Sequence, residues 1–447
     1  MKTNIVIIGG GPGGYQTALY AASHGLKVVI AEERLLGGTC LNKGCIPTKS
    51  LLHDAAIAYK LPIEERVPSF NAAVKRKDEI VSILRKRVID MLQGNDNITL
   101  ENGHAFLIDK GTVAIGEGKI YTPDSIIIAT GSQSWIPPIP GIFSPSSEKL
   151  DYVVTPEEIL SLKVVPQRLC IVGAGVIGME MATMFNAFGS KVTIIEAKPE
   201  CLPNLDGDIS RRIRKCMERK GIKFYLSCQV EKVDNHQIHF VERKRMQSLS
   251  AEADLILIAT GRHPLVRDIG LDQAGVKIDH GAISVDNNMQ TNIPGIYAIG
   301  DANGLQMLAH AATFQGRHVV NHLLGHGDTI RLDIMPAAIF TNPEAALVGR
   351  TEMDCKEKGI AYTCRKAVYR SNGRALSMDE TEGIVKIICA QDNVHTILGC
   401  QAFGKDSSYL VQEIASLMNR NISLKELEDI VHIHPTLSEL LLQTIEC

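Results

Sequence analysis

The sequence is short of net charge and of long apolar runs near its start. Its 447 residues carry a formal net charge of -3 at pH 7, and the isoelectric point is near 6.5. A chain so close to neutrality has no broad field to attract nucleic acid, so we expect no DNA or RNA partner. The first apolar run, residues 5–8, is too short for a secretory core or a membrane span. We therefore expect a cytoplasmic protein that does not engage a membrane.

The sequence also lacks the cysteine spacing of a metal site or of a secreted disulfide framework. It has 11 cysteines, an odd number, and all but two of them are scattered. We therefore expect no bound metal and regard the scattered cysteines as buried or idle thiols. Charged residues make up 22% of the chain and apolar residues 45%, a balance typical of globular proteins. The length favours roughly two to four domains.

The two exceptions are Cys40 and Cys45, in the stretch GGTCLNKGCIPTK. In a regular α-helix their Cα atoms would lie about 8 to 9 Å apart, too far for an unstrained disulfide, so Gly44 must let the backbone leave the helix. Pro47 suits the first position of a helix, and a helix that starts there would place the Cys45 sulfur near its positive end, which favours the thiolate, the form that exchanges with disulfides. The bare spacing also fits two packed cysteines, but the flanking glycines, Pro47 and Lys49 favour a redox pair.

A glycine-rich segment opens the chain. A buried strand from Asn4 leads into Gly9, Gly11 and Gly14, which form G-x-G-x-x-G, and a helix and a second strand follow. The first glycine allows a tight turn, the second lets a pyrophosphate approach the helix N-terminus, and the third allows close packing. The second strand ends at Glu32, whose carboxylate can accept a hydrogen bond from a ribose hydroxyl. The pattern predicts a dinucleotide-binding βαβ unit.

The same pattern recurs in the middle of the chain. Gly173, Gly175 and Gly178 follow a strand at residues 169–172, and the next strand ends at Glu196. In both copies the glutamate follows the first glycine by 23 positions, a repeat that chance clustering of glycines does not produce. Two such units predict two different cofactors. Because Glu196 would repel a 2′-phosphate, the second unit is predicted to bind NAD(H) rather than NADP(H).

Each glycine unit is later followed by an apolar strand that ends in Ala-Thr-Gly, at Gly131 and at Gly261. These strands are predicted to close the two nucleotide-binding units. A further apolar strand, within residues 291–304, ends at Asp301. A carboxylate at the carboxyl end of a strand can hydrogen-bond a polyol such as the ribityl chain of a flavin. The alternative reading of Asp301 is an ordinary turn aspartate.

A proline-rich stretch and the loss of nucleotide-binding motifs mark the boundaries between units. Trp135 is followed by Pro137, Pro138 and Pro140, the kind of stretch where few contacts cross between domains. The second glycine unit, residues 147–264, is therefore predicted to be inserted within the first. After residue 331 the sequence has no nucleotide motif, and it reads as a separate α+β unit.

The C-terminal stretch HIHPTLSELLLQ contains a candidate general base. Pro435 keeps His434 out of a helix and is expected to start one, with Glu439 about one turn along. A carboxylate held against a loop histidine raises the basicity of the imidazole and fixes its tautomer, as a base for a thiol requires. The spacing alone favours the alternative, a histidine that caps a helix beside a solvated glutamate. His432 is a weaker candidate.

Together these residues resemble the pyridine nucleotide-disulfide oxidoreductases, most closely the dihydrolipoamide dehydrogenases that act as E3 components of 2-oxo acid dehydrogenase complexes. The resemblance covers nearly the whole chain. It rests on both glycine motifs with Glu32 and Glu196, both Ala-Thr-Gly strands, and the segments GGTCLNKGCIPTK, TNIPGIYAIGD, LAHAATFQG, FTNPEAALVG and HPTLSE.

The resemblance implies a reaction and the residues that carry it. Cys40 and Cys45 would form a redox-active disulfide, with Cys40 exchanging with substrate and Cys45 facing the flavin of a bound FAD. Lys49 and Glu180 would form an ion pair beside the flavin. The implied enzyme oxidises protein-bound dihydrolipoamide to lipoamide through this disulfide and FAD, and it reduces NAD⁺ to NADH.

The resemblance also implies an architecture and partners. His434 and Glu439 would come from the other subunit of a homodimer. The partner would be a lipoyl domain or a lipoyl-carrying acyltransferase of a 2-oxo acid dehydrogenase complex or of the glycine cleavage system. We predict an α/β fold with two Rossmann-like dinucleotide-binding domains and an α+β C-terminal dimerisation domain. The expected divisions are a split FAD-binding domain at 1–146 and 265–330, an NAD-binding domain at 147–264 and an interface domain at 331–447.

Some residues depart from the family pattern or bear on alternatives within and beyond it. Gln315 stands where Glu is expected, and the loop after Glu32 is one residue short. Glutathione reductases usually carry a second Glu where this chain has Leu440, and mercuric reductases usually end in paired cysteines where Cys447 stands alone. A flavoprotein that serves as a scaffold or redox sensor would not need His434 beside a complete disulfide segment. The intact set favours an enzyme.

Overall fold

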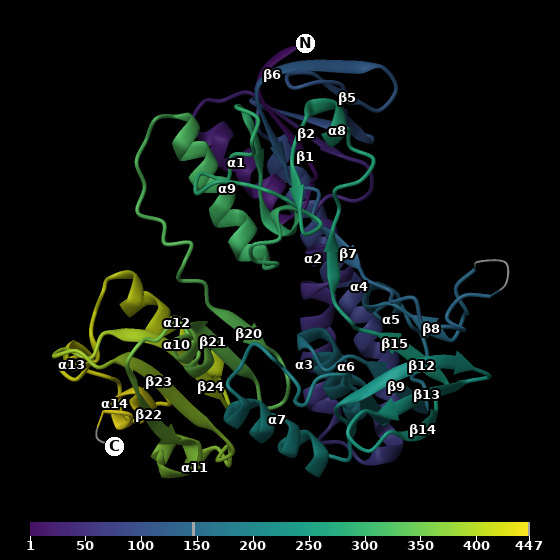
Figure 1. The fold of residues 1–447 in the computed structure, drawn as a ribbon, viewed down its shortest axis with the longest axis vertical. Helices are drawn as coiled ribbons and strands as arrows, with labels where there is room; N and C mark the ends of the chain where they lie inside the picture. Colours follow the sequence, from purple (N-terminus) through teal and green to yellow (C-terminus); the bar gives the residue numbers. More distant parts are fainter. Residues whose placement is uncertain (145–147, 446–447) are drawn as a thin grey trace.

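The structure is a computed structural model that describes residues 1–144 and 148–445, so Cys447 lies outside the described residues. Figure 1 shows three groups of elements: one at the top around the N-terminus and two below it, with the C-terminus at the lower left. Within the described ranges, no helix combines the length and the apolar character that a membrane crossing requires.

The first group is built on a mixed sheet with the strand order β3-β2-β1-β6-β5-β4, in which β19 also pairs with β6. Its strands are β1 (Lys2–Ile8), β2 (Val28–Glu32), β3 (Ile98–Asn102), β4 (Ala105–Leu107), β5 (Val113–Ile115), β6 (Lys119–Ile128) and β19 (Ile296–Ala298). β4 and β5 pair antiparallel with their neighbours, and the others pair in parallel. Because β19 comes from late in the chain, this sheet joins two distant segments.

Helices lie against this sheet and extend from it toward the second group. They are α1 (Pro12–Ser23), α2 (Gly38–Lys43), α3 (Cys45–Ala58), α4 (Ile63–Gln93) and α9 (Ala309–Leu323). α1 follows the first glycine motif directly and packs beside α9, as Figure 1 shows. α3 packs against α4 and against α6 (Val176–Ala187) of the second group. The two cysteines of the redox stretch therefore lie where the groups meet.

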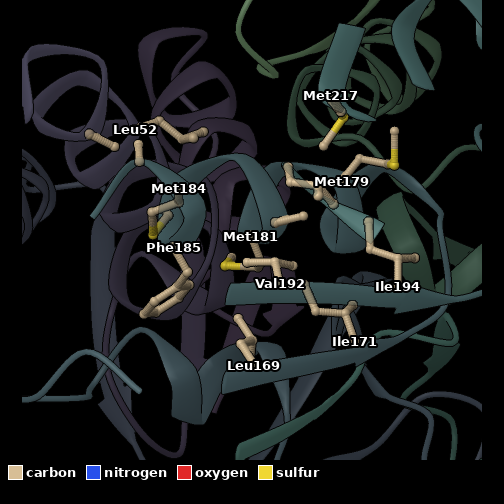
Figure 2. Close-up of a cluster of buried hydrophobic side chains, with 14 of the residues drawn as sticks. Leu52, Leu169, Ile171, Met179, Met181, Met184, Phe185, Val192, Ile194 and Met217 are labelled. Carbon is tan, nitrogen blue, oxygen red and sulfur yellow. The ribbon is translucent and has the colours of Figure 1, made fainter. Parts of the chain in front are cut away.

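The second group repeats the parallel design, with the strand order β11-β10-β9-β15-β8. Its elements are β8 (Val153–Val154), α5 (Pro156–Ile159), β9 (Arg168–Val172), β10 (Lys191–Ile195), α7 (Gly207–Arg219), β11 (Lys223–Tyr225) and β15 (Leu255–Ile258), together with the antiparallel strands β12 (Cys228–Asp234), β13 (Gln237–Glu242) and β14 (Gln247–Glu252). Figure 2 shows the core around α6, where Met181, Met184 and Phe185 pack with side chains of the sheet such as Leu169 and Val192.

Two short strands join these groups. β7 (Ser132–Ser134) follows β6 out of the first sheet, and β16 (Arg262–Pro264) follows β15 out of the second. They pair antiparallel, with Arg262 opposite Ser134 and Pro264 opposite Ser132. Figure 1 shows β7 between the upper group and the lower right group. We call residues 132–134 and 262–264 the crossover ribbon.

The third group is an antiparallel sheet with the order β20-β21-β24-β23-β22. Its strands are β20 (Ala337–Ile339), β21 (Ala345–Gly349), β22 (Tyr362–Val368), β23 (Ile384–Ala390) and β24 (Ile397–Phe403), and its helices are α10 (Glu352–Glu357), α11 (Gly373–Ser377), α12 (Ser407–Asn419), α13 (Leu424–Leu427) and α14 (Glu439–Gln443). The predicted α/β fold with a separate α+β C-terminal unit is confirmed.

Two expected helix starts are wrong, while the predicted break at Gly44 is confirmed. Gly44 separates α2 from α3 with φ -144° and ψ -112°, outside the helical region. α3 begins at Cys45 rather than at Pro47, because a proline is tolerated within the first turn, where the N–H groups have no helical partner. α14 begins at Glu439 rather than at Pro435, because the N–H of Thr436 donates to the Glu439 carboxylate and closes a turn.

Candidate functional site

A continuous cleft of about 1310 Å³ runs between the first and second groups. Both glycine turns, the two cysteines and the acidic residues named from the sequence contribute to its wall. The predicted site residues that line it are Gly9, Gly11, Glu32, Cys40, Cys45, Lys49, Gly131, Gly173, Gly175, Glu180, Glu196, Gly261 and Asp301. The structure thus brings together most of the residues that the sequence singled out.

The first and third glycines of each motif are fixed by backbone geometry. Gly9 and Gly173 have φ of +109° and +105°, in the left-handed region that disfavours a side chain. A Cβ atom at Gly14 would lie 1.8 Å from the carbonyl oxygen of Gly9, and one at Gly178 would lie 2.1 Å from that of Gly173. Neither third glycine lines the cleft among the described residues, so both serve helix packing, as predicted.

The second glycine of each motif leaves open space at a helix N-terminus. A Cβ at Gly175 would meet no atom within 4 Å, and one at Gly11 would meet only the Cα of Gly38, at 3.9 Å. Gly11 and Gly175 are the N-caps of α1 and α6, where backbone N–H groups lack helical partners and attract phosphate. Elsewhere on the cleft wall, the buried Oε1 of Gln306 has no hydrogen-bond partner in the described chain. These residues fit two bound dinucleotides.

The two motif glutamates occupy equivalent positions. Glu32 accepts hydrogen bonds from the N–H of Gly10 and Arg34, both at 2.8 Å. Glu196 accepts from the N–H of Ala174 at 2.6 Å and from that of Lys198 at 2.8 Å. Each carboxylate therefore braces its own glycine turn as well as lining the cleft, a second role that the sequence pattern did not predict.

Cys40 and Cys45 are free thiols in this structure, placed on opposite sides of the helix break at Gly44. A hydrogen bond between the two sulfur groups raises the pKa of Cys40, and burial raises it further. The same hydrogen bond, together with the nearby charge of Lys49, lowers the pKa of Cys45 to about 7 despite partial burial. The pair is thus polarised, with Cys40 as the protonated donor and Cys45 as the thiolate.

Lys49 lies one turn beyond Cys45 on α3 and forms an ion pair with Glu180 of α6. The Lys49 Nζ donates to both carboxylate oxygens of Glu180, at 3.0 and 2.8 Å. Glu180 is buried, with a side chain that is 4% exposed, and it also accepts the N–H of Phe340 at 2.9 Å. The Lys49 ammonium lies 4.7 Å from the centre of the Phe340 ring. The pair thus ties α3, α6 and the third group together at the cleft.

Asp301 lies on a 3-10 turn, η1 (Gly300–Asn303), that follows β19. The hydroxyl of Ser132 donates to its Oδ2 at 2.5 Å. Gln315, which the sequence marked only as a departure, is buried beneath the turn. Its Oε1 accepts the N–H of Gly300 at 2.7 Å and the amide of Asn303 at 3.1 Å. A neutral side chain therefore holds the turn that presents Asp301.

His434 and Glu439 form a pair that lies apart from the cleft. The His434 Nδ1 is 2.9 Å from the Glu439 Oε1, and this hydrogen bond, with that from the N–H of Thr436, lowers the pKa of Glu439. The His434 side chain is 82% exposed. Among the described residues that line the cleft, neither member of the pair is present. Within one chain, the candidate base therefore does not meet Cys40 or Cys45.

Sequence reasoning missed three polar residues that line or border the cleft. Ser132 and Arg262 each follow an Ala-Thr-Gly directly, and Glu157 is the second residue of α5. Arg262 donates to the side chains of Ser132 and Glu157, and Ser132 donates to Asp301. The matching position of a polar residue after both Ala-Thr-Gly strands was a signal that could have found two of them.

A second group of acidic residues lies away from the cleft. Asp206, Asp208 and Glu352 place carboxylate oxygens within 4.8 Å of one another. The buried ammonium of Lys386 lies among them, 2.9 Å from Asp206 and 3.0 Å from Asp208. This lysine supplies the positive charge that balances the cluster, which joins the start of α7 to the third group.

Comparison with known proteins agrees with this arrangement. A family model described as pyridine nucleotide-disulphide oxidoreductase matches residues 3–316, and a model of that family's dimerisation domain matches residues 335–445. A dihydrolipoyl dehydrogenase of Chlamydia muridarum is 37% identical over 445 residues, covering 97% of this chain and 94% of that protein. A dihydrolipoyl dehydrogenase of Staphylococcus aureus is 33% identical and covers 100% and 96%, respectively.

Two further relatives carry different names. Leghemoglobin reductase of Glycine max is 34% identical, covering 98% of this chain and 86% of that protein. Among solved structures, the Cu(II) complex of the HOCl-induced flavoprotein disulfide reductase RclA from Escherichia coli has a TM-score of 0.88 and 31% identity, and the match covers 100% of this chain and 99% of that one.

Proposed function

The chain belongs to the pyridine nucleotide-disulphide oxidoreductase family, and we propose from that premise that it oxidises dihydrolipoamide to lipoamide and reduces NAD⁺ to NADH. The observation that carries the proposal is the polarised pair Cys40 and Cys45 in one cleft with two dinucleotide turns. Full-length similarity to dihydrolipoyl dehydrogenases favours the dihydrolipoamide–lipoamide couple over other dithiol–disulfide couples.

Two cofactors are proposed, FAD on the first glycine unit and NAD(H) on the second. Gly9, Gly11 and Glu32 would hold FAD together with Asp301, while Gly173, Gly175 and Glu196 would hold NAD(H). Gly14, Gly178, Gly131 and Gly261 support these sites through backbone geometry. When bound, the flavin supplies the electron transfer from the dithiol to NAD⁺, chemistry that protein side chains do not perform.

The first half-reaction is a thiol–disulfide exchange at Cys40. The Nε2 of His434 takes the proton of one dihydrolipoamide thiol, and the resulting thiolate attacks the Cys40 sulfur of the Cys40–Cys45 disulfide. A substrate–Cys40 disulfide forms, and Cys45 leaves as a thiolate. The second substrate thiol then attacks the substrate sulfur, which releases lipoamide and leaves Cys40 as a thiol. Two electrons and two protons have passed from substrate to protein.

The electrostatics of the cleft suit the reduced pair. A Cys45 thiolate is stabilised by the hydrogen bond from Cys40 and by the charge of Lys49, and Glu180 holds Lys49 in place. A low pKa keeps Cys45 in the form that donates electrons, while Cys40 keeps a proton until the two cysteines re-form their disulfide.

The base is proposed to come from the partner subunit of a homodimer. Because the Nδ1 of His434 faces Glu439, the ring proton belongs on Nδ1 and Nε2 is left to accept the substrate proton. Its exposure and its distance from the cleft within one chain support delivery by a second copy. A dimerisation domain at residues 335–445 supports the same arrangement.

The division of the chain and its partner follow the same proposal. We assign residues 1–146 and 265–330 to the FAD-binding domain, 147–264 to the NAD-binding domain and 331–447 to the interface domain. Return of the chain to the first sheet at β19 supports the split. The physiological substrate would be a lipoyl group on an acyltransferase or lipoyl domain of a 2-oxo acid dehydrogenase complex or the glycine cleavage system, in the cytoplasm.

The proposal is tested by NAD⁺ reduction with dihydrolipoamide, set against NADPH oxidation by glutathione disulfide. The first reaction should proceed and the second should not. Cys45→Ser should abolish the first reaction, while Cys364→Ser, which removes another partly exposed cysteine, should leave it intact. Activity with glutathione disulfide alone would move the chain to the glutathione reductases. Failure of both reactions in a chain that holds FAD would favour a redox sensor.

A further inference from the structure

We propose that Arg262 is a positioning residue that orients Asp301 and connects it, through Glu157, to the second glycine unit. The inference rests on the proposed function, in which Asp301 binds the ribityl chain of FAD. Arg262 lies at the start of β16, in the crossover ribbon, and its side chain is 15% exposed. It therefore occupies the point where the chain returns from the second group to the first.

The guanidinium group of Arg262 is held by its neighbours on several sides. Its Nε donates to the hydroxyl of Ser132 at 2.8 Å, and its Nη2 donates to the carbonyl of Ser132 at 2.8 Å. Its Nη1 donates to the Oε1 of Glu157 at 2.6 Å and to the hydroxyl of Ser134 at 3.4 Å. A planar fork with fixed donors makes this set of contacts, which a lysine ammonium could not reproduce.

The contact with Ser132 fixes the direction of the next hydrogen bond. Because Arg262 donates to the Ser132 oxygen, the single proton of that hydroxyl is left to point elsewhere. It points at the Oδ2 of Asp301, 2.5 Å away. In the described chain, no residue donates a hydrogen bond to the Oδ1 of Asp301, which remains for a polyol hydroxyl. Arg262 thus directs the Ser132 hydroxyl to one oxygen of Asp301 and leaves the other oxygen without a donor among the described residues.

The contact with Glu157 anchors the arrangement in the second group. Glu157 lies in α5, and its other oxygen accepts the hydroxyl of Ser134 at 2.7 Å. Although burial alone would raise the pKa of Glu157, the hydrogen bonds from Arg262 and Ser134 outweigh it and lower that pKa. Glu157 therefore remains charged and holds the guanidinium at neutral pH. The chain of contacts runs from α5 through the ribbon to η1.

Two consequences follow for the cofactors. Removal of Arg262 frees the Ser132 hydroxyl to rotate and leaves Asp301 without a fixed donor, so FAD should bind less tightly. A shift of α5 on NAD⁺ binding would move Glu157, and the guanidinium would carry that shift to Asp301. Charge-assisted hydrogen bonds of this kind transmit position because their geometry is narrow. The ribbon would thus couple the two nucleotide sites.

The first test is the dissociation constant of FAD, measured by ultrafiltration for wild type, Arg262→Met, Ser132→Ala and the double variant. Each single variant should weaken FAD binding by about tenfold, the size of one lost charge-assisted hydrogen bond. The double variant should bind FAD as tightly as the single variant with the lower affinity, because Arg262 acts through Ser132. Arg168→Met is the matched control: Arg168 forms a comparable ion pair with Asp254 and should leave FAD affinity unchanged.

The second test measures coupling with Glu157→Ala. NAD⁺ should alter the FAD absorbance of the wild-type protein, and this change should fall several-fold in Glu157→Ala and in Arg262→Met. NAD⁺ binding itself is followed independently by the fluorescence of Trp135, the one tryptophan, which lies beside the cleft and packs edge-on against His263 at 5.5 Å. Saturation of the fluorescence change at a similar NAD⁺ concentration would show that the second site is intact.

Equal FAD affinity in Arg262→Met and wild type, or effects of Arg262→Met and Ser132→Ala that add, would overturn the role of Arg262. If Arg262→Met does not fold, Ser132→Ala decides alone, since unchanged FAD affinity in that variant also refutes the chain of contacts. These measurements need FAD binding but not turnover. A wild-type chain that binds FAD and fails to oxidise dihydrolipoamide would contradict the proposed function without contradicting the role of Arg262.

Discussion

Lys49 donates to both carboxylate oxygens of Glu180, at 3.0 and 2.8 Å, from a helix that begins at Cys45. Glu180 is almost fully buried, whereas Lys49 is 35% exposed, so the pair spans the edge between the cleft and the protein interior. A buried carboxylate requires a counter-charge, because its transfer from water is costly. The pair therefore stabilises the fold at the same place where it sets the charge beside the cysteines.

We expect Lys49→Met to destabilise the protein by about 2 kcal/mol, below the range for fully buried pairs because Lys49 is partly exposed. The measurement is the urea midpoint of the protein without cofactor. Lys86→Met is the control, since Lys86 pairs with Asp90 at the surface and should contribute less than about 0.5 kcal/mol. Equal losses in the two variants would contradict the importance of the buried partner.

The reactivity of Cys45 should titrate near neutral pH. Its pKa is lowered to about 7 from an ordinary value of 9.0, so the thiolate forms as pH rises through about 7. The rate of alkylation by iodoacetamide should therefore rise across that range and level off above it, because only the thiolate reacts. Cys40→Ala removes the hydrogen bond that contributes most to the lowering and should move the inflection upward. Lys49→Met should move it upward by a smaller amount, and an unchanged inflection in Cys40→Ala would contradict this account.

Much of the fold and of the cleft could be predicted from the sequence, because the controlling interactions are local. Gly9 and Gly173 need a positive φ, and Gly14 and Gly178 leave no room for a Cβ, so the motifs specify their turns directly. Gly44 likewise marks the helix break between the cysteines. Such constraints act over a few residues and can therefore be recognised from the sequence alone.

Other parts of the site depend on contacts between distant segments. Arg262 donates to Ser132, 130 positions earlier in the chain, and Gln315 supports Gly300 from another helix. The polar residue after each Ala-Thr-Gly marks Ser132 and Arg262 as candidates, but no local pattern shows that the residues of either pair are in contact. The helix expected at Pro435 was wrong because the turn is set by the Glu439 carboxylate. The resemblance to the family placed the His434–Glu439 pair in the other subunit of a homodimer, but no local pattern in the sequence shows this. In the structure the pair lies outside the cleft of its own chain.

The second glycine unit should prefer NAD⁺ over NADP⁺. Glu196 lines the cleft and is held by two backbone N–H groups, so its carboxylate has a fixed position. If the second unit binds NAD(H) as proposed, this carboxylate would repel a 2′-phosphate on the ribose. Glu196→Gln should reduce the preference for NAD⁺ by about tenfold, which corresponds to the loss of one charged interaction. The ratio of kcat/KM for the two nucleotides is the measurement.

Glu32→Gln is the matched control for this prediction, because Glu32 braces the first glycine turn in the same way. It should weaken FAD binding and leave the nucleotide preference unchanged. A wild-type protein that uses both nucleotides with equal kcat/KM would contradict the assignment of Glu196. An altered preference in Glu32→Gln would contradict the assignment of the two units to different cofactors.

The central claim is that each site joins the cysteine pair of one subunit to His434 of the other. The direct test mixes Cys40→Ser chains with His434→Gln chains under conditions where subunits exchange, and it follows NAD⁺ reduction by dihydrolipoamide. Each variant alone should be nearly inactive. Random mixing makes half of the dimers mixed, each with one intact site, so about a quarter of the wild-type activity should return. Demonstrated subunit exchange without any return of activity would contradict the shared site.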